Sequence, residues 1–231
     1  MKRVLILDGA IYRDIYRPAE HWRTLLGGVP AEAVHLPSGE SVPSLDRFTH
    51  VIVTGSEGSI TRPEPWYEVE ADVARDAAER GLPLLGSCFG HQMLARALSG
   101  ERYVAASAAP EVGWVPVDVL APDELFADVG KTFWVFVSHF DEVCDPPPPW
   151  RVLARSAGCA VQAMRLGERP IWGIQAHPEI TPTDARILIE GFLRYAPHLA
   201  PQMRPALEAE PHDDGTAAPV VRRFLAAEPR R

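Results

Sequence analysis

The stretch "PLLGSCFGHQMLARALSG", residues 83–100, decides the fold that the sequence predicts. Its first apolar residues indicate a short buried strand, and in its second half apolar residues recur at helical spacing. Between the two, Cys88 stands with Gly86 and Gly90 on either side. A sharp strand-to-helix corner needs residues without side chains around it. We therefore predict a strand, a tight corner at the cysteine and a helix over 89–99.

The rest of the chain divides into two halves. In the first half, apolar strands alternate with helices, which predicts a parallel sheet covered by helices on both faces. In the second half, strands follow one another without helices, which favours antiparallel additions to that sheet. Thr181 or Thr183 can cap the helix that follows them. The predicted strands are 3–8, 31–36, 50–56, 82–87, 112–120, 132–139, 150–156, 160–166 and 170–177, and the predicted helices are 18–27, 64–81, 89–99, 181–196 and 219–227.

Composition restricts the class of protein. The 231 residues carry a formal net charge of −8, so the chain lacks the basic surface that nucleic-acid binding needs. No apolar run approaches the length of a membrane span, and the four apolar residues before Asp8 are too few for a signal peptide. Three cysteines without framework spacing are typical of a reducing compartment. We expect a cytoplasmic protein that binds neither nucleic acid nor membrane.

The length fits one domain, and we expect residues 1–231 to form it. Residues 197–231 are expected to be a peripheral C-terminal segment. Within it, the stretch 197–218 is rich in proline and alanine and predicts a surface excursion, while 219–227 can form a last helix.

Cys88 has the setting of a nucleophile. A thiol reacts as the thiolate, and a helix N-terminus lowers the pKa of a thiol through its dipole and free N–H groups. A strand-to-helix corner also lifts the sulfur clear of the sheet, where the backbone N–H of Phe89 can face a developing oxyanion. The alternative is a buried structural cysteine beside glycines that merely pack.

The stretch "GIQAHPEIT", residues 173–181, supplies a candidate base. His177 ends an apolar strand and Glu179 follows two residues later, so a strand period of two predicts both side chains on one side, with the carboxylate orienting the imidazole. Functional strand ends gather at the carboxyl edge of a parallel sheet, where Cys88 and His177 can meet. Together they would form a nucleophile–base–orienter set. A surface His-Pro-Glu turn is the alternative.

Four stretches together resemble one known family, the class I (triad-type) glutamine amidotransferase domain. The corner "GSCFGHQ" matches its Gly-x-Cys-x-Gly-x-Gln elbow, and "QAHPE" contains its His-Pro-Glu. The segment "VSHFDEV" (137–143) is similar to a Ser-His-x-Asp-x-Val segment in the amidotransferase domain of GMP synthase. The segment "VTGSEGS" (53–59) lies where the family carries a Gly-Gly-Pro oxyanion loop. The resemblance covers about residues 3–195. With the strand pattern, it implies a three-layer flavodoxin-like sandwich whose mostly parallel central sheet has antiparallel extensions.

The resemblance implies a cysteine amidohydrolase that releases ammonia from glutamine through a γ-glutamyl thioester and needs no cofactor. In that mechanism Cys88 is the nucleophile, His177 the base and Glu179 the group that orients the base. The implied oxyanion hole uses backbone N–H groups of Phe89, Gly55 and Ser56, and the implied substrate-binding residues are Gln92, Ser138, His139 and Asp141.

Two departures leave the substrate and the partner open. Ser56 and Glu57 stand where the family has its second glycine and its proline, and this bulkier acidic loop could favour a γ-glutamyl amide or peptide over free glutamine. The sequence also has no Gly-x-x-x-x-Gly-Lys-Ser/Thr phosphate loop. Ammonia would then pass to a separate synthase subunit, or the chain would be a stand-alone γ-glutamyl hydrolase. A third alternative, a non-catalytic regulatory or binding protein, leaves the intact set of catalytic residues without a purpose.

The segment after residue 138 also permits other roles. His139 and Asp141 could be structural rather than substrate-binding. With Cys144 they form a His-x-Asp-x-x-Cys pattern, which fits no common zinc site, so we expect no metal.

Overall fold

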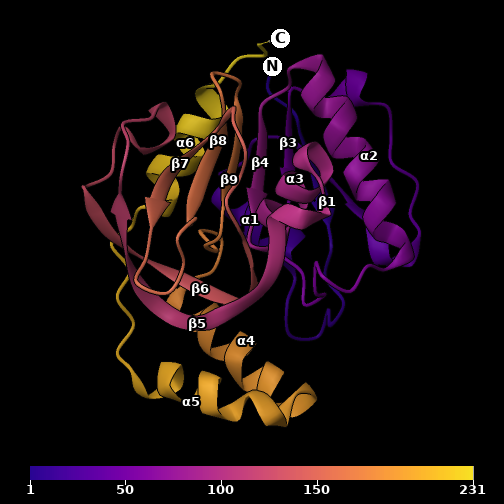
Figure 1. Cartoon of the computed structure of the whole chain (residues 1–231). Helices are drawn as coiled ribbons and strands as arrows, with labels where there is room; N and C mark the ends of the chain where they lie inside the picture. The colour runs from indigo at the N-terminus through magenta and orange to yellow at the C-terminus, as the bar shows by residue number, and fades with distance from the viewer. Residues whose placement is uncertain (231) are drawn as a thin grey trace.

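The computed structural model describes residues 1–230, and within them the chain forms one sheet of nine strands (Figure 1). The strands are β1 (Val4–Asp8), β2 (Ala31–His35), β3 (His50–Val53), β4 (Leu84–Ser87), β5 (Val104–Val119), β6 (Thr132–Val143), β7 (Trp150–Arg155), β8 (Ala163–Leu166) and β9 (Ile171–Ile174). Their order across the sheet is β2-β1-β3-β4-β9-β8-β7-β5-β6. The first five strands in this order are parallel, and β8, β7, β5 and β6 add antiparallel pairings. The predicted mixed sheet is confirmed.

Helices cover both faces of the parallel strands. They are α1 (Pro18–Leu25), α2 (Pro65–Arg80), α3 (Phe89–Ser99), α4 (Pro182–Tyr195), α5 (Ala200–Glu208) and α6 (Ala217–Ala226), with short 3-10 turns η1 (Leu36–Ser38), η2 (Leu45–Arg47), η3 (Glu101–Tyr103), η4 (Glu124–Phe126) and η5 (Pro197–Leu199). Leu5 and Leu7 of β1 share a core with α2 and α3, while Val4 and Ile6 share one with α1 and α6. Alternate residues of one strand thus enter opposite cores, which confirms the three-layer sandwich. No helix within residues 1–230 has both the length and the apolar composition of a membrane span.

The helices α4 and α5 lie together at one end of the molecule, at the bottom of Figure 1. The predicted surface excursion over 197–218 is wrong for the part that forms α5, because Met203 is fully buried in an apolar cluster with Phe136 of β6. Gly113 of β5 adopts a φ of 114°, and a β-carbon there would lie 3.0 Å from that of Ala206. The segment is therefore packed on the sheet.

Several strand boundaries differ from those predicted. The strand predicted over 112–120 begins at Val104, and its partner continues to Val143, because β5 and β6 pair along most of their length across an irregularity between Ala106 and Glu111. Small and exposed residues in the first part of β5 conceal this strand from a hydrophobic pattern.

Two predicted strands end early, and this shapes the site. The strands predicted over 50–56 and 170–177 stop at Val53 and Ile174. The residues that follow form loops at the carboxyl edge of the parallel strands, where β4 also ends at Ser87. In Figure 1 the curled pair of β5 and β6 passes beneath this edge.

Candidate active site

Cys88 occupies the corner between β4 and α3 with a φ of 51° and a ψ of −108°. Such a conformation costs a residue with a side chain about 1–3 kcal/mol. The Cys88 N–H donates to the carbonyl of Ile174 at 2.9 Å, which ties the corner to β9. A β-carbon on Gly86 would collide with the backbone of Gly90, and one on Gly90 with the carbonyl of Val53. The corner can close only with glycine at both positions.

His177 and Glu179 meet in a turn after β9. Nδ1 of His177 lies 2.8 Å from Oε1 of Glu179, and each residue is 4% exposed. The strand geometry predicted for this pair is wrong, because β9 ends at Ile174. The backbone leaves the sheet there: the His177 N–H donates to the carbonyl of Phe136, and the Ile180 N–H donates back to the carbonyl of His177. A turn, rather than the pleat of a strand, brings the two side chains together.

The electrostatics of the site favour a protonated imidazole. Burial by itself lowers the pKa of His177, because a charge is costly away from water. The negative charges of a Cys88 thiolate and of Glu179 outweigh burial and raise this pKa to about 10. Burial likewise opposes the ionisation of Glu179, but His177 and the Tyr16 hydroxyl bring its pKa below the ordinary value. An imidazolium between a thiolate and a carboxylate is the arrangement of an activated thiol nucleophile.

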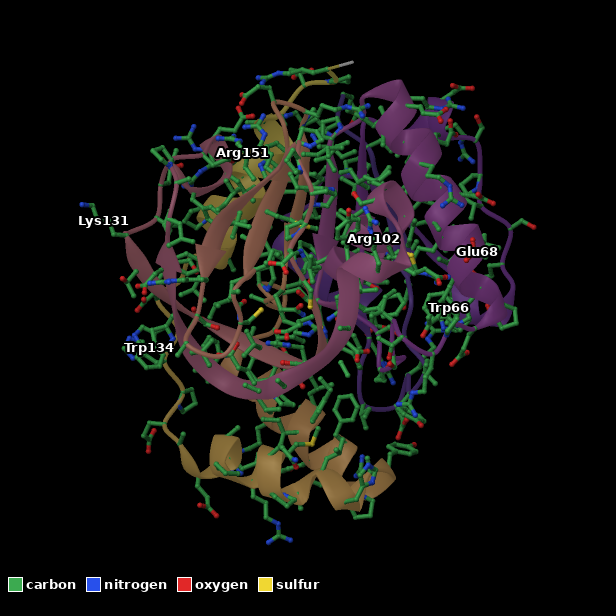
Figure 2. The ribbon with its side chains drawn as sticks, viewed as in Figure 1. Trp66, Glu68, Arg102, Lys131, Trp134 and Arg151 are labelled. Atoms are coloured by element: carbon green, nitrogen blue, oxygen red, sulfur yellow. The ribbon has the colours of Figure 1, made fainter. Side chains whose placement is uncertain are left out.

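Two backbone donors of the predicted oxyanion hole lie beside the corner. Phe89 is the first residue of α3, so its N–H has no acceptor within the helix. Its ring lies 5.4 Å from that of Trp66, labelled in Figure 2 at the start of α2, and 5.0 Å from that of Tyr67. In the described part of the chain, the N–H of Ser56 donates to no protein acceptor.

The loop after β3 is held in place by Glu57. Its carboxylate accepts the backbone N–H of Ile11 at 2.7 Å and that of Tyr12 at 3.3 Å. Burial raises the pKa of Glu57, and the two N–H donors act against that shift. The acidic residue that replaces the proline of the family pattern thus fastens this loop to the loop after β1.

Gln92 and Ser138 face each other across the space above Cys88. The Gln92 side-chain amide donates to the carbonyl of Asp141 at 2.7 Å and to Oε1 of Gln175 at 3.2 Å. The carbonyl of Ser138 lies 3.6 Å from Sγ of Cys88. These contacts hold β6 against the first turn of α3.

The side chains of His139 and Asp141 are engaged with the protein itself. Oδ2 of Asp141 accepts the Ser59 hydroxyl at 2.6 Å and the N–H of Ile60 at 3.0 Å. The His139 ring lies 3.1 Å from the Asp141 carbonyl through Nδ1 and 3.2 Å from a Glu111 carboxylate oxygen through Nε2. This geometry favours a structural role for both side chains.

A cavity of about 340 Å³ opens over Cys88. His177 and Glu179 are buried behind it, so the nucleophile faces the cavity and the base supports it from within the protein. The sequence-predicted site residues that line the cavity are Ser56, Cys88, Phe89, Gln92, Ser138, His139 and Asp141. Residues from the end of α4 and from η5 complete the wall, namely Phe192, Tyr195, Ala196, His198 and Leu199. No group of three His, Cys, Asp or Glu side chains in residues 1–230 is arranged to hold a metal ion.

Comparison with known proteins places the chain in a family. The family model for "Glutamine amidotransferase class-I" matches residues 28–194. The chain belongs to the class I glutamine amidotransferases. A subunit of the glutamine-hydrolyzing GMP synthase of Methanothermobacter thermautotrophicus is 35% identical to this amidotransferase over 147 residues, which are 64% of this chain and 77% of that protein. The subunit of the same name from Sulfolobus acidocaldarius is 33% identical over 68% of this chain and 80% of its own length.

A longer relative and two solved structures complete the comparison. The glutamine-hydrolyzing GMP synthase of Aeropyrum pernix is 38% identical over 160 residues, which are 68% of this amidotransferase and 29% of that protein. A glutamine amidotransferase of Thermotoga maritima superposes with a TM-score of 0.77 at 21% identity, covering 98% of this chain and 99% of that one. The glutamine amidotransferase of Methylobacillus flagellatus gives 0.76 at 21% identity, covering 100% and 96%. These structures support the flavodoxin-like fold.

The family assignment confirms the resemblance drawn from the elbow and the His-Pro-Glu segment, and with it an enzyme of the amidotransferase class. Sequence reasoning overlooked three parts of this amidotransferase: Tyr16, whose hydroxyl touches the buried pair behind the nucleophile, the fastening role of Glu57, and the cavity wall made by 192–199. None of them carries a local signal, since each acts through residues far away in the chain.

Proposed function

We propose that this amidotransferase hydrolyses the side-chain carboxamide of glutamine to glutamate and ammonia through a γ-glutamyl thioester. One observation carries the proposal. The strained corner presents Cys88 to a cavity of about 340 Å³, while the ion-paired His177 and Glu179 stand buried behind the corner. Nucleophile, base and orienting carboxylate are thereby gathered at one edge of the sheet.

The proposed reaction has two stages. Sγ of Cys88 attacks the amide carbon, and the oxyanion that forms accepts hydrogen bonds from the N–H groups of Phe89 and of Gly55 or Ser56. His177 gives its Nε2 proton to the amide nitrogen, the carbon–nitrogen bond breaks and ammonia leaves. His177 then takes a proton from water, which attacks the thioester and releases glutamate and the thiol. Glu179 holds the imidazole in one orientation throughout.

The glutamyl part of the substrate is proposed to lie in the cavity. Gln92 and the backbone of Ser138 border it next to the nucleophile. His139 and Asp141 contribute there by holding β6 and the loop at 59–60 in place, because their side chains are already engaged by Glu111, Ser59 and Ile60.

The packing around His177 supports an unsubstituted carboxamide over a larger γ-glutamyl amide. The leaving nitrogen must come within hydrogen-bond reach of this base. The imidazole is 4% exposed, and the ring centroids of Tyr16 and Phe136 lie 5.8 and 6.2 Å from its own. Ammonia fits such a place, whereas an alkyl or peptidyl group on the nitrogen meets these rings.

A separate synthase subunit is the proposed acceptor of the ammonia. The support comes from the relatives that are named as one subunit of a GMP synthase, which this chain matches over 77% and 80% of their length. The Aeropyrum pernix GMP synthase matches over 29% of its own length, so most of that protein lies outside the region shared with this chain.

The test is the release of glutamate and ammonia by the purified protein from glutamine, γ-glutamylmethylamide and a γ-glutamyl dipeptide, with Cys88→Ala as the control. We expect Cys88-dependent turnover of glutamine and a sharp loss with a single N-methyl group. Preference for the dipeptide would replace the proposal with a γ-glutamyl hydrolase. A chloroketone analogue of glutamine provides a second readout, because it should alkylate Cys88 before any other cysteine. Neither turnover nor such labelling would refute the proposal.

A further inference from the structure

Tyr16 is a buried tyrosine that the proposed mechanism leaves without a role. It lies in the loop between β1 and α1 and is 2% exposed. Its backbone N–H donates to the carbonyl of Tyr12 at 3.0 Å, which closes a turn and fixes the direction of the side chain. The ring enters the apolar cluster that also contains Phe136 of β6 and Leu188 of α4. Three distant segments therefore hold this side chain in one position.

The Tyr16 hydroxyl reaches the back of the buried ion pair. It lies 2.7 Å from Oε1 of Glu179 and 3.4 Å from Nδ1 of His177. The tyrosine and imidazole rings stand edge to face, with an angle of 86° between their planes. The other oxygen, Oε2, lies 3.3 Å from the hydroxyl of Ser87, which also donates to the carbonyl of Ala176 at 3.0 Å.

The direction of the hydrogen bond follows from the chemistry of the groups. An ionised carboxylate accepts hydrogen bonds and cannot donate them. Burial, and then the charge of Glu179, raise the pKa of Tyr16 well above its ordinary value, so the phenol keeps its proton. Oε1 of Glu179 thus accepts two hydrogen bonds, one from Tyr16 and one from His177.

We propose that Tyr16 is a positioning residue of this site: its hydroxyl fixes Oε1 of Glu179 behind the imidazole and keeps that carboxylate charged. The inference rests on the proposed function, in which Glu179 supports His177. Tyr16 touches neither the cavity nor the nucleophile, so it acts on the reaction through Glu179.

The sign of the effect can be worked out. A donor to the charged form of a carboxylate lowers its pKa, so removing the Tyr16 hydroxyl raises the pKa of Glu179. Below the new pKa a neutral Glu179 no longer supports the imidazolium at His177 or the thiolate that pairs with it. The acidic limb of the activity profile therefore moves to higher pH. The other titratable groups that face the pair are Cys88 from the corner, Glu57 from the loop after β3 and His21 from α1.

The experiment compares Tyr16→Phe with Tyr67→Phe over the pH range. Tyr67 is a matched control, since it is also buried and its hydroxyl donates to a backbone carbonyl, that of Ser59, at 3.1 Å. For Tyr16→Phe we expect kcat to fall roughly tenfold near neutral pH, KM to stay unchanged and the acidic limb of kcat/KM to rise by about one pH unit. Tyr67→Phe should leave the limb in place. A pH-independent loss in both variants would mean a structural role alone and would overturn the inference.

A second readout does not depend on turnover. The rate at which iodoacetamide alkylates Cys88, followed at that residue by peptide mass spectrometry, reports the thiolate at each pH. Tyr16→Phe should shift this profile in the same direction, and it should add no shift in a Glu179→Gln background, where no carboxylate is left to support. An unshifted alkylation profile would overturn the role of Tyr16 whether or not the wild type releases ammonia. A shifted profile in a protein without turnover would uphold Tyr16 and refute the proposed function.

Discussion

Gly55 packs so closely against His177 that a β-carbon at position 55 would lie 2.6 Å from Cε1 of the imidazole. The same β-carbon would lie 2.7 Å from the Tyr16 hydroxyl. Both distances are too short for a real contact, and the atoms concerned belong to rings that are themselves packed. The first residue of the loop after β3 thus has a task beyond offering an N–H group, because it lets the loop lie against the base.

Gly55→Ala should therefore damage catalysis more than folding. The added methyl group displaces the imidazole, and a misplacement of about 1 Å costs roughly 100-fold in rate. We expect kcat to fall by about that factor, measured by ammonia release from glutamine. The control is Gly130→Ala in the loop between β5 and β6, where the nearest atom to a new β-carbon is the Thr132 carbonyl oxygen at 3.2 Å. Wild-type kcat in Gly55→Ala would contradict the packing argument.

Cys88→Ala should abolish turnover and keep the fold, because the side chain is replaced without a change at the corner. Cys88→Gly should also be inactive but more stable than Cys88→Ala. A φ of 51° strains alanine as it strains cysteine, whereas glycine adopts it freely. The expected difference is about 1 kcal/mol, the lower end of the usual range for such strain. Thermal unfolding of the two inactive variants measures it, and equal stabilities would show that the corner stores no strain.

Loss of His177 should cost more activity than loss of Glu179. His177→Asn removes the acid–base group, which contributes roughly 10²- to 10⁴-fold in such reactions. Glu179→Gln removes only the charge that supports the base, so its kcat/KM should fall less. Glu208→Gln, an exposed glutamate at the end of α5, serves as the control for the loss of one charge. A Glu179 variant as inactive as the His177 variant would show that the carboxylate does more than orient the base.

Glu70 should make the fold less stable as the pH rises. It is fully buried in α2, and within residues 1–230 neither carboxylate oxygen has a hydrogen-bond partner. Burial, and then the charge of Asp8, raise its pKa well above the ordinary 4.5. The folded state therefore holds this proton more tightly than the unfolded chain, and stability is lost from about pH 4.5 upward, until the pH passes the folded-state pKa.

Glu70→Gln removes this linkage, so its melting temperature should exceed that of the wild type by a margin that grows between about pH 4.5 and neutral pH. Thermal unfolding at a series of pH values measures the margin. Glu79→Gln, at an exposed position of the same helix, should show no such trend. A margin independent of pH would mean that Glu70 is paired in solution.

The parts of this protein that the sequence predicts well are those whose cause is local. Gly86, Cys88 and Gly90 lie within one turn of chain, and their steric demands can be read from residue type alone. The choice between two caps for α4 was also nearly determined, since Thr181 has an acidic residue three positions later, and Asp184 completes a capping box with it.

Long-range contacts decided the remainder. No hydrophobic period reveals the first part of β5, because its stability comes from pairing with β6 rather than from its own side chains. The helix α5 was hidden for a related reason, as Met203 becomes a core residue only when it packs beside Phe136.

The sequence by itself determined the α/β fold, the family and the likeness of Cys88, His177 and Glu179 to a catalytic set, because these follow from residue types at short spacing. Only the tertiary structure decided how the set is supported. The turn after β9 replaces the predicted strand, and Tyr16 meets Glu179 although 163 positions separate them in the chain. A hydrogen bond acts over about 3 Å in space, and no pattern along the chain encodes which distant residue arrives there.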